Sequence, residues 1–251
     1  MILESEGIVL KQTKTINGRK MLSIFTPKYG KVSVGANITP SKTSKTALYT
    51  RPFTYARYHM FKGKDSFSLN SAEVIESYYK IGEDFDKYVS SSLALELTDK
   101  LLMWDDPNEP LFMLLKDFLK EMMERKKSYD TLLLSYMVKV LSITGIMPNL
   151  TSCSICNKSD GIGSFFNVKS GGIVCEKCGK NLLNTGDAEL LFNVNFDIIN
   201  VIMYFLKEPL KSFKNIALDP KAEKDLKAIL LEYYKYHLDI GELKTEKLSI
   251  Y

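Results

Sequence analysis

Four cysteines, arranged in two pairs, are the residues whose spacing points most directly to chemistry. They are the chain's whole cysteine content, and eighteen residues separate the first CxxC pair from the second. A CxxC turn presents two sulfurs on one side of a bend, and two such turns supply four thiolates in the tetrahedral arrangement that zinc prefers. The sequence therefore predicts one metal site, formed by Cys153, Cys156, Cys175 and Cys178.

Other interpretations of these cysteines stay open. An iron–sulfur cluster also takes four thiolates, although the paired spacing favours zinc. Two disulfides require an oxidising compartment, and the acidic, mixed opening of the chain is unlike a secretory signal. A redox CxxC site needs only one pair of cysteines. We expect a structural Zn²⁺, because four cysteines leave no coordination position for water. The glycine-rich segment between the pairs predicts a short hairpin that is too small to be stable without this metal.

Length and composition predict a soluble globular protein. The 251 residues can form two or three domains, and 45% are hydrophobic while 25% are charged. No run of about eighteen apolar residues predicts a membrane span, so we expect a cytoplasmic location.

Positive charge is concentrated near the N-terminus. The net charge is only +4, but residues 1–65 carry twelve Lys and Arg against three Asp and Glu, a balance of +9. The remaining residues carry a balance of −5. This asymmetry predicts that the N-terminal region presents a cationic field to a polyanion.

The N-terminal region reads as five short strands with turns between most of them. Alternating and β-rich runs predict strands at 7–11, 20–26, 31–35, 53–61 and 66–73. A closed barrel protects the edges of such strands, and we favour an OB-like barrel over an SH3-like one.

The rest of the chain reads as helices that surround the cysteine segment. Apolar residues at helical spacing predict helices at 84–104, 110–125, 129–142, 188–206 and 220–238. The expected fold is therefore α+β, with an OB-fold DNA-binding domain at 1–79 and a helical domain at 80–251. A four-cysteine zinc module is inserted in the helical domain at about 149–181.

A catalytic set is missing from the sequence. The two histidines, His59 and His237, are not beside a candidate nucleophile, and no phosphate-binding loop or nucleophile elbow occurs. We therefore predict a protein that binds and does not catalyse.

Cations and aromatic rings alternate along the predicted barrel. A surface for single strands needs cations for phosphates and exposed rings for bases, although rings in small barrels mostly fill the interior. Few groups here read base edges, so binding independent of sequence is expected. The candidate DNA-binding residues are Lys11, Lys14, Arg19, Lys20, Lys28, Lys31, Lys42, Lys45, Arg51 and Arg57, with Tyr29, Tyr49 and Tyr58 as stacking candidates.

The order of a basic barrel, a helical body and an inserted cysteine module resembles the RecO family of bacterial recombination mediators. The chain departs from many relatives at 18–20, where an acidic residue is usual, and at Asn37, where a basic one is usual. The matching residues are 7–11, Phe25-Thr26 before Gly30-Lys31, 34–36, Ser41-Lys42, and Gly145-Ile146-Met147-Pro148 ahead of the cysteines.

The resemblance implies a DNA repair and recombination role. It implies binding of single- and double-stranded DNA, annealing of complementary strands, help in loading RecA, and a nucleoid-associated location. Implied partners are RecR and the C-terminal tail of single-strand-binding protein, an apolar and acidic peptide that needs a pocket with a basic rim. The helices at 111–123 and 132–141 are the expected pocket, with Lys116, Lys120, Lys126 and Lys139 as rim residues. A zinc-stabilised protein-interaction scaffold that binds no DNA is the competing hypothesis.

Overall fold

The computed structural model describes residues 2–15, 20–36, 48–64 and 66–246. The chain forms two compact units. Unit 1 contains residues 1–129 and 243–251, and unit 2 contains residues 130–242. The expected domain boundary at residue 79 stays a prediction.

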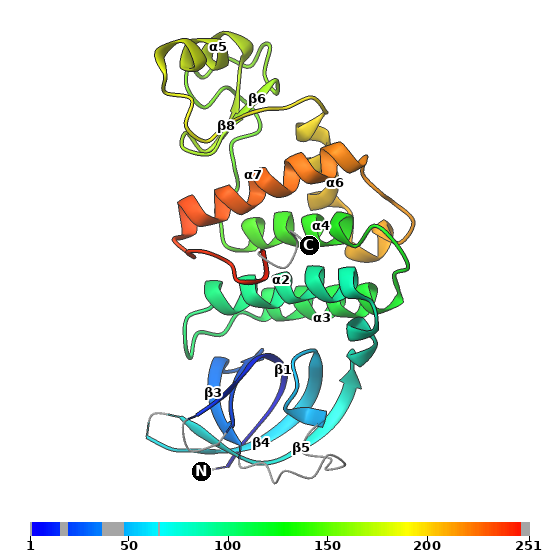
Figure 1. Ribbon diagram of the computed structural model, residues 1–251. Coiled ribbons are helices and arrows are strands. Elements are labelled where there is room, and N and C mark those ends of the chain that lie inside the picture. The colour runs from blue at the N-terminus through cyan, green and yellow to red at the C-terminus, as the bar shows by residue number, and fades with distance from the viewer. Residues whose placement is uncertain (1, 16–19, 37–47, 65, 247–251) are drawn as a thin grey trace. The chain divides into compact units, whose positions relative to one another are not determined.

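Unit 1 begins with a closed five-stranded barrel of order β1-β2-β3-β5-β4 (Figure 1). All neighbouring strands are antiparallel except β3 and β5, which pair in parallel through Val34 and Phe67. Their bounds are β1 (Ile2–Lys14), β2 (Lys20–Thr26), β3 (Gly30–Ala36), β4 (Thr54–Lys62) and β5 (Phe67–Ser77). The predicted fold class, an OB-like barrel followed by helices and a four-cysteine module, is confirmed.

Alternating side chains fill the barrel, as the period of two predicts. Leu22, Ile24, Val32 and Val34 point inward from neighbouring strands and are almost fully buried. The strands extend beyond their predicted ends, β1 starting at Ile2 and β5 continuing to Ser77. These extensions are polar on one face, so hydrophobic runs alone did not reveal them.

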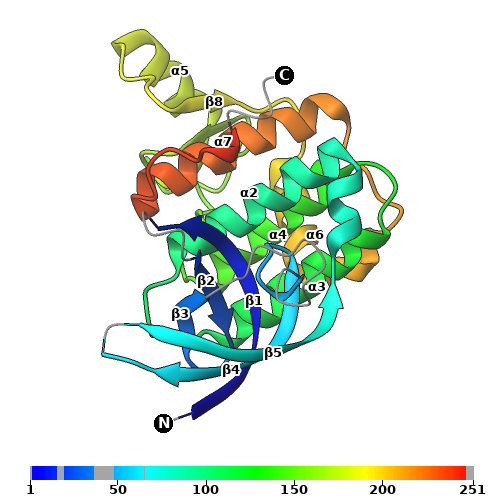
Figure 2. The ribbon, with the colours of Figure 1, turned by 60° about the horizontal axis from the view of Figure 1, so that its bottom comes forward.

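Two helices of unit 1 pack against the outside of the barrel (Figures 1 and 2). They are α2 (Phe85–Leu101) and α3 (Glu109–Glu124), and a 3-10 helix, η1 (Tyr79–Glu83), leads into α2. Phe112 of α3 meets Phe25 of β2 edge-to-face at 5.4 Å between ring centroids. The Ser23 hydroxyl of β2 donates to Asp99 of α2 at 2.8 Å. The outer faces of β1 and β2 are therefore partly covered by helices of the same unit.

A carboxylate on α2 holds the C-terminal segment of unit 1. Glu96 accepts hydrogen bonds from the backbone N–H groups of Lys244 and Thr245, each at 2.8 Å, and from the Thr245 hydroxyl at 2.6 Å. Although burial raises the pKa of Glu96, these hydrogen bonds lower it below the ordinary value of 4.5.

We expect the stabilisation from Glu96 to depend on pH. Because its folded-state pKa is depressed, the contribution is full above pH 4.5 and is lost as pH falls through the folded-state pKa. Glu96→Gln should lower the thermal midpoint at neutral pH, and the difference from the native chain should shrink well below pH 4.5. Thermal denaturation followed across that range tests this, and a difference that stays constant with pH would contradict it.

Unit 2 is built on three helices and the cysteine module. The helices are α4 (Tyr129–Ile143), α6 (Ile198–Lys207) and α7 (Pro220–Leu238), with a 3-10 helix, η2 (Leu210–Phe213), after α6. The buried Tyr234 hydroxyl of α7 donates to the Met137 carbonyl of α4 at 2.7 Å, and Lys227 pairs with Asp130 at 2.7 Å.

The helix expected at 188–206 begins ten residues late, and this part of the prediction was wrong. Leu191–Asn193 forms strand β8, which pairs with a strand of the cysteine module. Asp197 then caps α6, its carboxylate accepting from the Asn200 N–H at 3.1 Å. Apolar content alone did not separate the strand from the helix. Within the described parts of the chain, no helix is long and apolar enough to cross a membrane.

Candidate metal centre and cationic surface

A small three-stranded sheet and one helix position the four cysteines. The sheet has the order β7-β6-β8, with β6 (Phe165–Asn167), β7 (Gly172–Val174) and β8. Cys153 and Cys156 lie on a turn closed by the bond from the Asn157 N–H to the Cys153 carbonyl at 2.9 Å. Cys175 is the N-cap of α5 (Glu176–Thr185), and Cys178 lies in its first turn. The predicted hairpin is present as β6 and β7, but α5 and β8 were not predicted.

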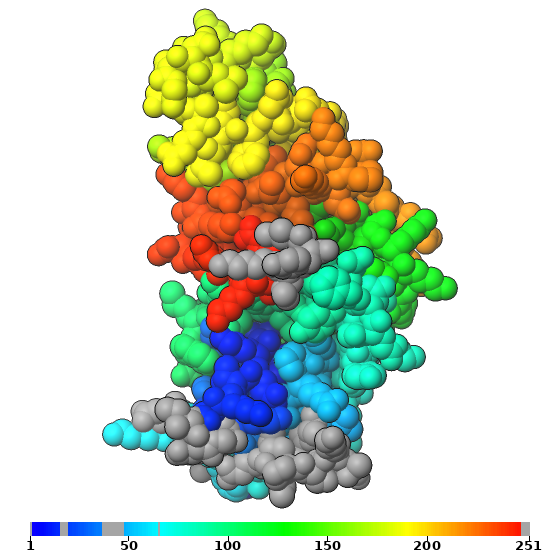
Figure 3. Space-filling model, in the orientation of Figure 1, coloured from blue at the N-terminus to red at the C-terminus, as the bar shows by residue number. Residues whose placement is uncertain are grey.

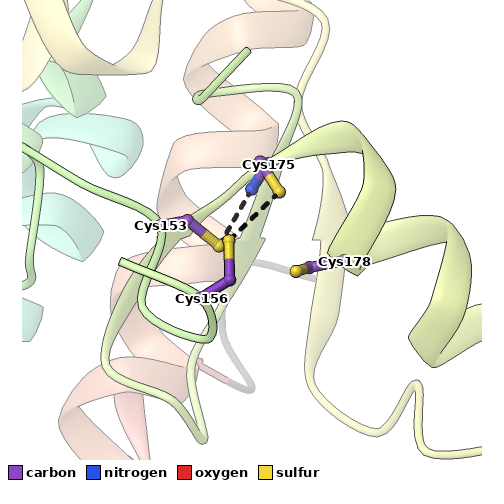
Figure 4. Close-up of side chains that lie close together, drawn as sticks. All are labelled: Cys153, Cys156, Cys175 and Cys178. Carbon is purple, nitrogen blue, oxygen red and sulfur yellow. Dashed lines mark hydrogen bonds between the residues drawn. The ribbon is translucent and has the colours of Figure 1, made fainter. Parts of the chain in front are cut away.

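The four sulfurs converge (Figure 4). All four lie within 4.8 Å of one another, and the Cys156 and Cys175 sulfurs are 3.8 Å apart. A tetrahedral zinc site with Zn–S bonds of about 2.3 Å has sulfur–sulfur edges of about 3.8 Å. The cysteine cluster is therefore the size of a four-thiolate metal site.

Backbone N–H groups prepare this cluster for negative charge. The Cys175 N–H points to the Cys153 sulfur at 3.4 Å. Although burial raises the pKa of the Cys153 thiol, N–H groups of Cys175, Cys156 and Ile155 bring it down to about 6. Burial and the neighbouring sulfurs raise the pKa of Cys178. Four thiolates at this spacing repel one another, so a divalent cation is the species that lets all four ionise together.

Close packing ties the module to α7. Phe166 of β6 meets Tyr233 edge-to-face at 6.0 Å, and the His237 ring lies 2.7 Å from the Val168 carbonyl through Nε2. A side chain at Gly179, next to Cys178, would place its Cβ 2.3 Å from the Phe165 ring. The module therefore packs closely against α7, and α5 packs closely against β6 next to Cys178.

Two predicted DNA-binding lysines lie directly opposite each other at one end of the barrel. Lys14, the last residue of β1, pairs with Lys20, the first residue of β2, and Lys20 pairs with Ala36 at the end of β3. Directly opposed side chains have Cβ atoms about 5 Å apart, and like charges there are destabilising. An anion between the two ammonium groups would relieve this repulsion. We call this feature the lysine pair.

Two further predicted cations lie near the same end of β1. Lys11 is exposed on β1, and Arg51 follows Thr50, whose carbonyl accepts from the Gln12 amide at 3.0 Å. Lys28 lies at the opposite end of β2, in the turn to β3, with its ammonium 5.4 Å from the Tyr29 ring centroid. Lys11 pairs with Ser23 on the face of β1 that meets α2, opposite to the face that carries Lys14, so Lys11 and Lys28 both lie outside the lysine pair. Arg19, Lys42 and Lys45 lie outside the described residues.

Lys31 is a correction to the predicted DNA surface, whereas Arg57 stays a prediction. Lys31 is buried, donates to the Asp99 backbone carbonyl, and lies 3.6 Å from the Asp99 carboxylate. Arg57 lies 3.5 Å from Glu4 and 3.6 Å from Glu6. Packing against α2 therefore removes Lys31 from the surface, whereas the Arg57 side chain is 44% exposed beside its two acidic neighbours.

Tyr58 is a correction among the stacking candidates. It is fully buried in the barrel and its hydroxyl donates to the Tyr49 carbonyl at 2.8 Å, so it cannot offer its ring to a base. Burial accordingly raises the pKa of Tyr58. Tyr29 and Tyr49 are half-buried and pack against the same core. The core interpretation thus describes these three rings better than stacking does.

Comparisons with known proteins agree with this architecture. The family model described as Recombination protein O N terminal matches residues 1–78, and Recombination protein O C terminal matches residues 82–247. The chain belongs to the RecO family. The resemblance seen in the sequence is thereby confirmed.

Two of the curated RecO relatives match the chain almost from end to end, and a third matches about seven tenths of it. A DNA repair protein RecO from Thermoanaerobacter is 30% identical over 245 residues, covering 98% of this chain and 96% of the relative. One from Alkaliphilus metalliredigens is 28% identical over 241 residues, covering 95% of each. One from Clostridium acetobutylicum is 34% identical over 182 residues, covering 71% of this chain and 72% of the relative.

The predicted partner-binding lysines of this RecO-family chain are divided between the units, with Lys116, Lys120 and Lys126 in unit 1 and Lys139 in unit 2. Lys116 on α3 lies half-buried, 5.4 Å from the Tyr55 ring centroid, while Lys120 and Lys126 are exposed. Most apolar residues of α3 are buried, although Met113 is 42% exposed. Lys139 on α4 donates to the Leu206 carbonyl at 3.0 Å, and burial lowers its pKa.

An open apolar pocket of about 780 Å³ lies instead at α6. Val201, Met203, Tyr204 and Leu206 line it, with Lys207 beside them. Met203 and Tyr204 are exposed. The signal in the sequence for this pocket was the presence of large apolar residues on both faces of α6, because a short helix that packs on one side leaves the other face uncovered.

Proposed function

We propose that the chain is a non-enzymatic DNA-binding mediator of repair and recombination. In this role it binds single- and double-stranded DNA, anneals complementary strands, and assists RecA loading together with RecR. Family membership along both parts of the chain supports this assignment. The observation that carries the DNA-binding part is the lysine pair.

The lysine pair suits a phosphate backbone because a phosphate offsets the repulsion between the two ammonium groups. Binding that rests on phosphate contacts is independent of sequence and weakens as salt rises. Neutralising phosphates also reduces the repulsion between two strands, which is the main electrostatic barrier to their approach. Weak contacts of this kind allow strands to shift and test their pairing.

We propose that the cysteine cluster holds a structural Zn²⁺. The sulfur spacing and the N–H groups directed at Cys153 support this, and four cysteines fill the coordination sphere. Zinc would stabilise the fold of the module and would leave no site for an activated water. The metal would therefore contribute to structure and not to catalysis.

The α6 pocket supports the proposed binding of the C-terminal tail of single-strand-binding protein. An apolar and acidic tail needs an apolar pocket with a cation nearby, and this pocket offers Met203, Tyr204 and Lys207. Lys139, a predicted rim residue, bonds the carbonyl of Leu206, which lines the same pocket. This location fits the tail better than the buried apolar face of α3.

The DNA-binding proposal predicts a strong effect of reversing the lysine pair. Lys14→Glu/Lys20→Glu should weaken binding of a labelled oligonucleotide at least roughly tenfold at about 0.1 M salt, and should flatten the salt dependence. Fluorescence anisotropy of the full chain measures both quantities. Lys80→Glu, a reversal of another exposed lysine of unit 1, is the matched control and should bind nearly as the native chain does.

The competing scaffold hypothesis makes the opposite prediction. A protein that only links other proteins would not retain a plain oligonucleotide at low salt. Failure of the native chain to bind, or equal binding by the Lys14→Glu/Lys20→Glu and native chains, would reject the assigned surface.

A further inference from the structure

Trp104, the chain's single tryptophan, is poorly covered for so large an apolar side chain. It follows α2 in unit 1, and its side chain is 55% exposed. The buried Lys31 ammonium lies 4.6 Å from its ring centroid. Because Lys31 covers one face of the indole, the exposed area belongs to the other face and the edges. An indole held on a buried cation with one open face is a rigid stacking platform.

Two lysines of the β4–β5 hairpin border this ring. Trp104 lines a pocket of about 370 Å³ together with Lys62 and Lys64 of the hairpin and Ser33 of β3. Both lysines are exposed. The tip of this hairpin projects beyond the neighbouring barrel strands in both ribbon views, and it projects from the surface in Figure 3. The pocket thus combines an aromatic floor with long, exposed cationic side chains at its edge.

We propose that this pocket is a second contact site for single-stranded nucleic acid, in which one base stacks on Trp104 and Lys62 and Lys64 bind the flanking phosphates. The inference rests on the proposed DNA-binding function and extends it to residues outside the lysine pair. Stacking uses the face of a base and not its hydrogen-bonding edge, so the site tolerates any sequence.

The register of the barrel places this pocket within reach of a strand bound at the lysine pair. Lys62 pairs with Phe67, and Phe67 pairs with Val34 near the end of β3, two residues before Ala36. Ala36 in turn pairs with Lys20. Neighbouring strands are about 4.8 Å apart, so these steps span a few nucleotides.

Charge decides between nucleic acid and an acidic peptide as the occupant. Asp105, the residue after Trp104, also lines the pocket, so the lining includes one acidic residue beside the two lysines. A peptide that carries its acids next to its aromatic ring would bring them close to Asp105. An extended nucleic acid strand carries its phosphates away from the base, toward the hairpin tip and the lysines. We therefore assign the pocket to a single strand.

The single tryptophan makes the test direct. Titration of the native full chain with oligothymidylate should quench its tryptophan fluorescence and saturate at the concentration at which a labelled copy shows anisotropy saturation. Stacking on an aromatic ring contributes enough that Trp104→Ala should weaken binding roughly 5- to 150-fold. Trp104→Phe should recover most of this loss, because a ring remains.

Matched variants separate stacking from charge and from folding. Met103→Ala removes the exposed apolar neighbour of Trp104 and should leave affinity unchanged. Lys62→Gln/Lys64→Gln should lower the salt slope of single-strand binding by about 0.7 for each phosphate that is no longer neutralised. Lys80→Gln should leave the slope unchanged. Circular dichroism and thermal melting verify that each variant is folded.

The Trp104 pocket and the proposed DNA-binding function can fail separately in these experiments. Oligonucleotide binding that leaves the tryptophan signal unchanged and is insensitive to Trp104→Ala would overturn the pocket while leaving the lysine pair standing. No oligonucleotide binding at all would overturn both. Quenching by an acidic peptide that displaces the oligonucleotide from Trp104 would reassign the pocket to a protein partner and overturn the inference.

Discussion

Cys175→Ser should abolish metal binding and unfold the cysteine module. The native chain should contain close to one zinc per chain, and the variant should contain almost none. Apparent binding free energies of structural zinc sites are about 10–16 kcal/mol at neutral pH, far more than this small sheet can supply by packing. The residues around β6, β7 and α5 should then become sensitive to protease, while unit 1 keeps its native stability.

Ile155→Ser is the matched control for the cysteine variant. Ile155 lies between Cys153 and Cys156 in the other CxxC turn, is 44% exposed, and has no ligand atom. This variant should retain its zinc and its protease resistance. Elemental analysis combined with limited proteolysis measures both properties. A Cys175→Ser chain that kept a full zinc and an intact module would contradict the four-cysteine site, and iron in the native chain would assign the cluster to another metal.

Gly30→Ala should destabilise unit 1 by about 2–5 kcal/mol. Gly30 begins β3 with a φ of +66°, a region that side chains disfavour. A Cβ there would lie 2.2 Å from the Asp106 carbonyl oxygen and 2.6 Å from the Asp106 nitrogen. Since both atoms belong to backbone, the turn after β2 would have to separate from the segment that follows α2. Urea denaturation measures the change.

Variants at two other glycines separate the two causes of that loss, which are the positive φ and the close approach of the Cβ to Asp106. A Cβ at Gly82 would meet no atom within 4 Å, and the backbone there has no positive φ, so Gly82→Ala should be nearly neutral. Gly145 has a φ of +74° but open space around it, so Gly145→Ala should show backbone strain alone, about 1 kcal/mol. A Gly30→Ala chain as stable as the Gly82→Ala chain would show that β3 does not approach Asp106 so closely.

Local patterns were sufficient to predict most elements of the fold. The alternation of Leu22, Ile24, Val32 and Val34 placed two strands, because one face of a barrel strand is always interior. Helix α7 was predicted with its observed bounds, since Pro220 at its start is a strong local signal. The convergence of the cysteines followed from their spacing, because two CxxC turns have few other uses.

Properties that depend on distant partners could not be predicted in this way. Lys31 looked like a DNA-binding cation, but Asp99, far along the chain, holds it in the interior. Tyr58 lies on the inward face of β4, which the alternation of rings and polar residues did not settle. Trp104 gave no signal as a site, because its neighbours Lys62 and Lys64 come from a hairpin about forty residues earlier. Side-chain partners across the fold, and not composition, decided these cases.

The central claim is that the lysine pair neutralises phosphates and thereby brings complementary strands together. Annealing of two complementary oligonucleotides, followed by fluorescence with the full chain at low salt, tests it most directly. We expect the native and Lys80→Glu chains to accelerate annealing, salt to suppress the effect, and Lys14→Glu/Lys20→Glu to lose it while staying folded. Undiminished annealing by Lys14→Glu/Lys20→Glu would show that the lysine pair does not bring the strands together.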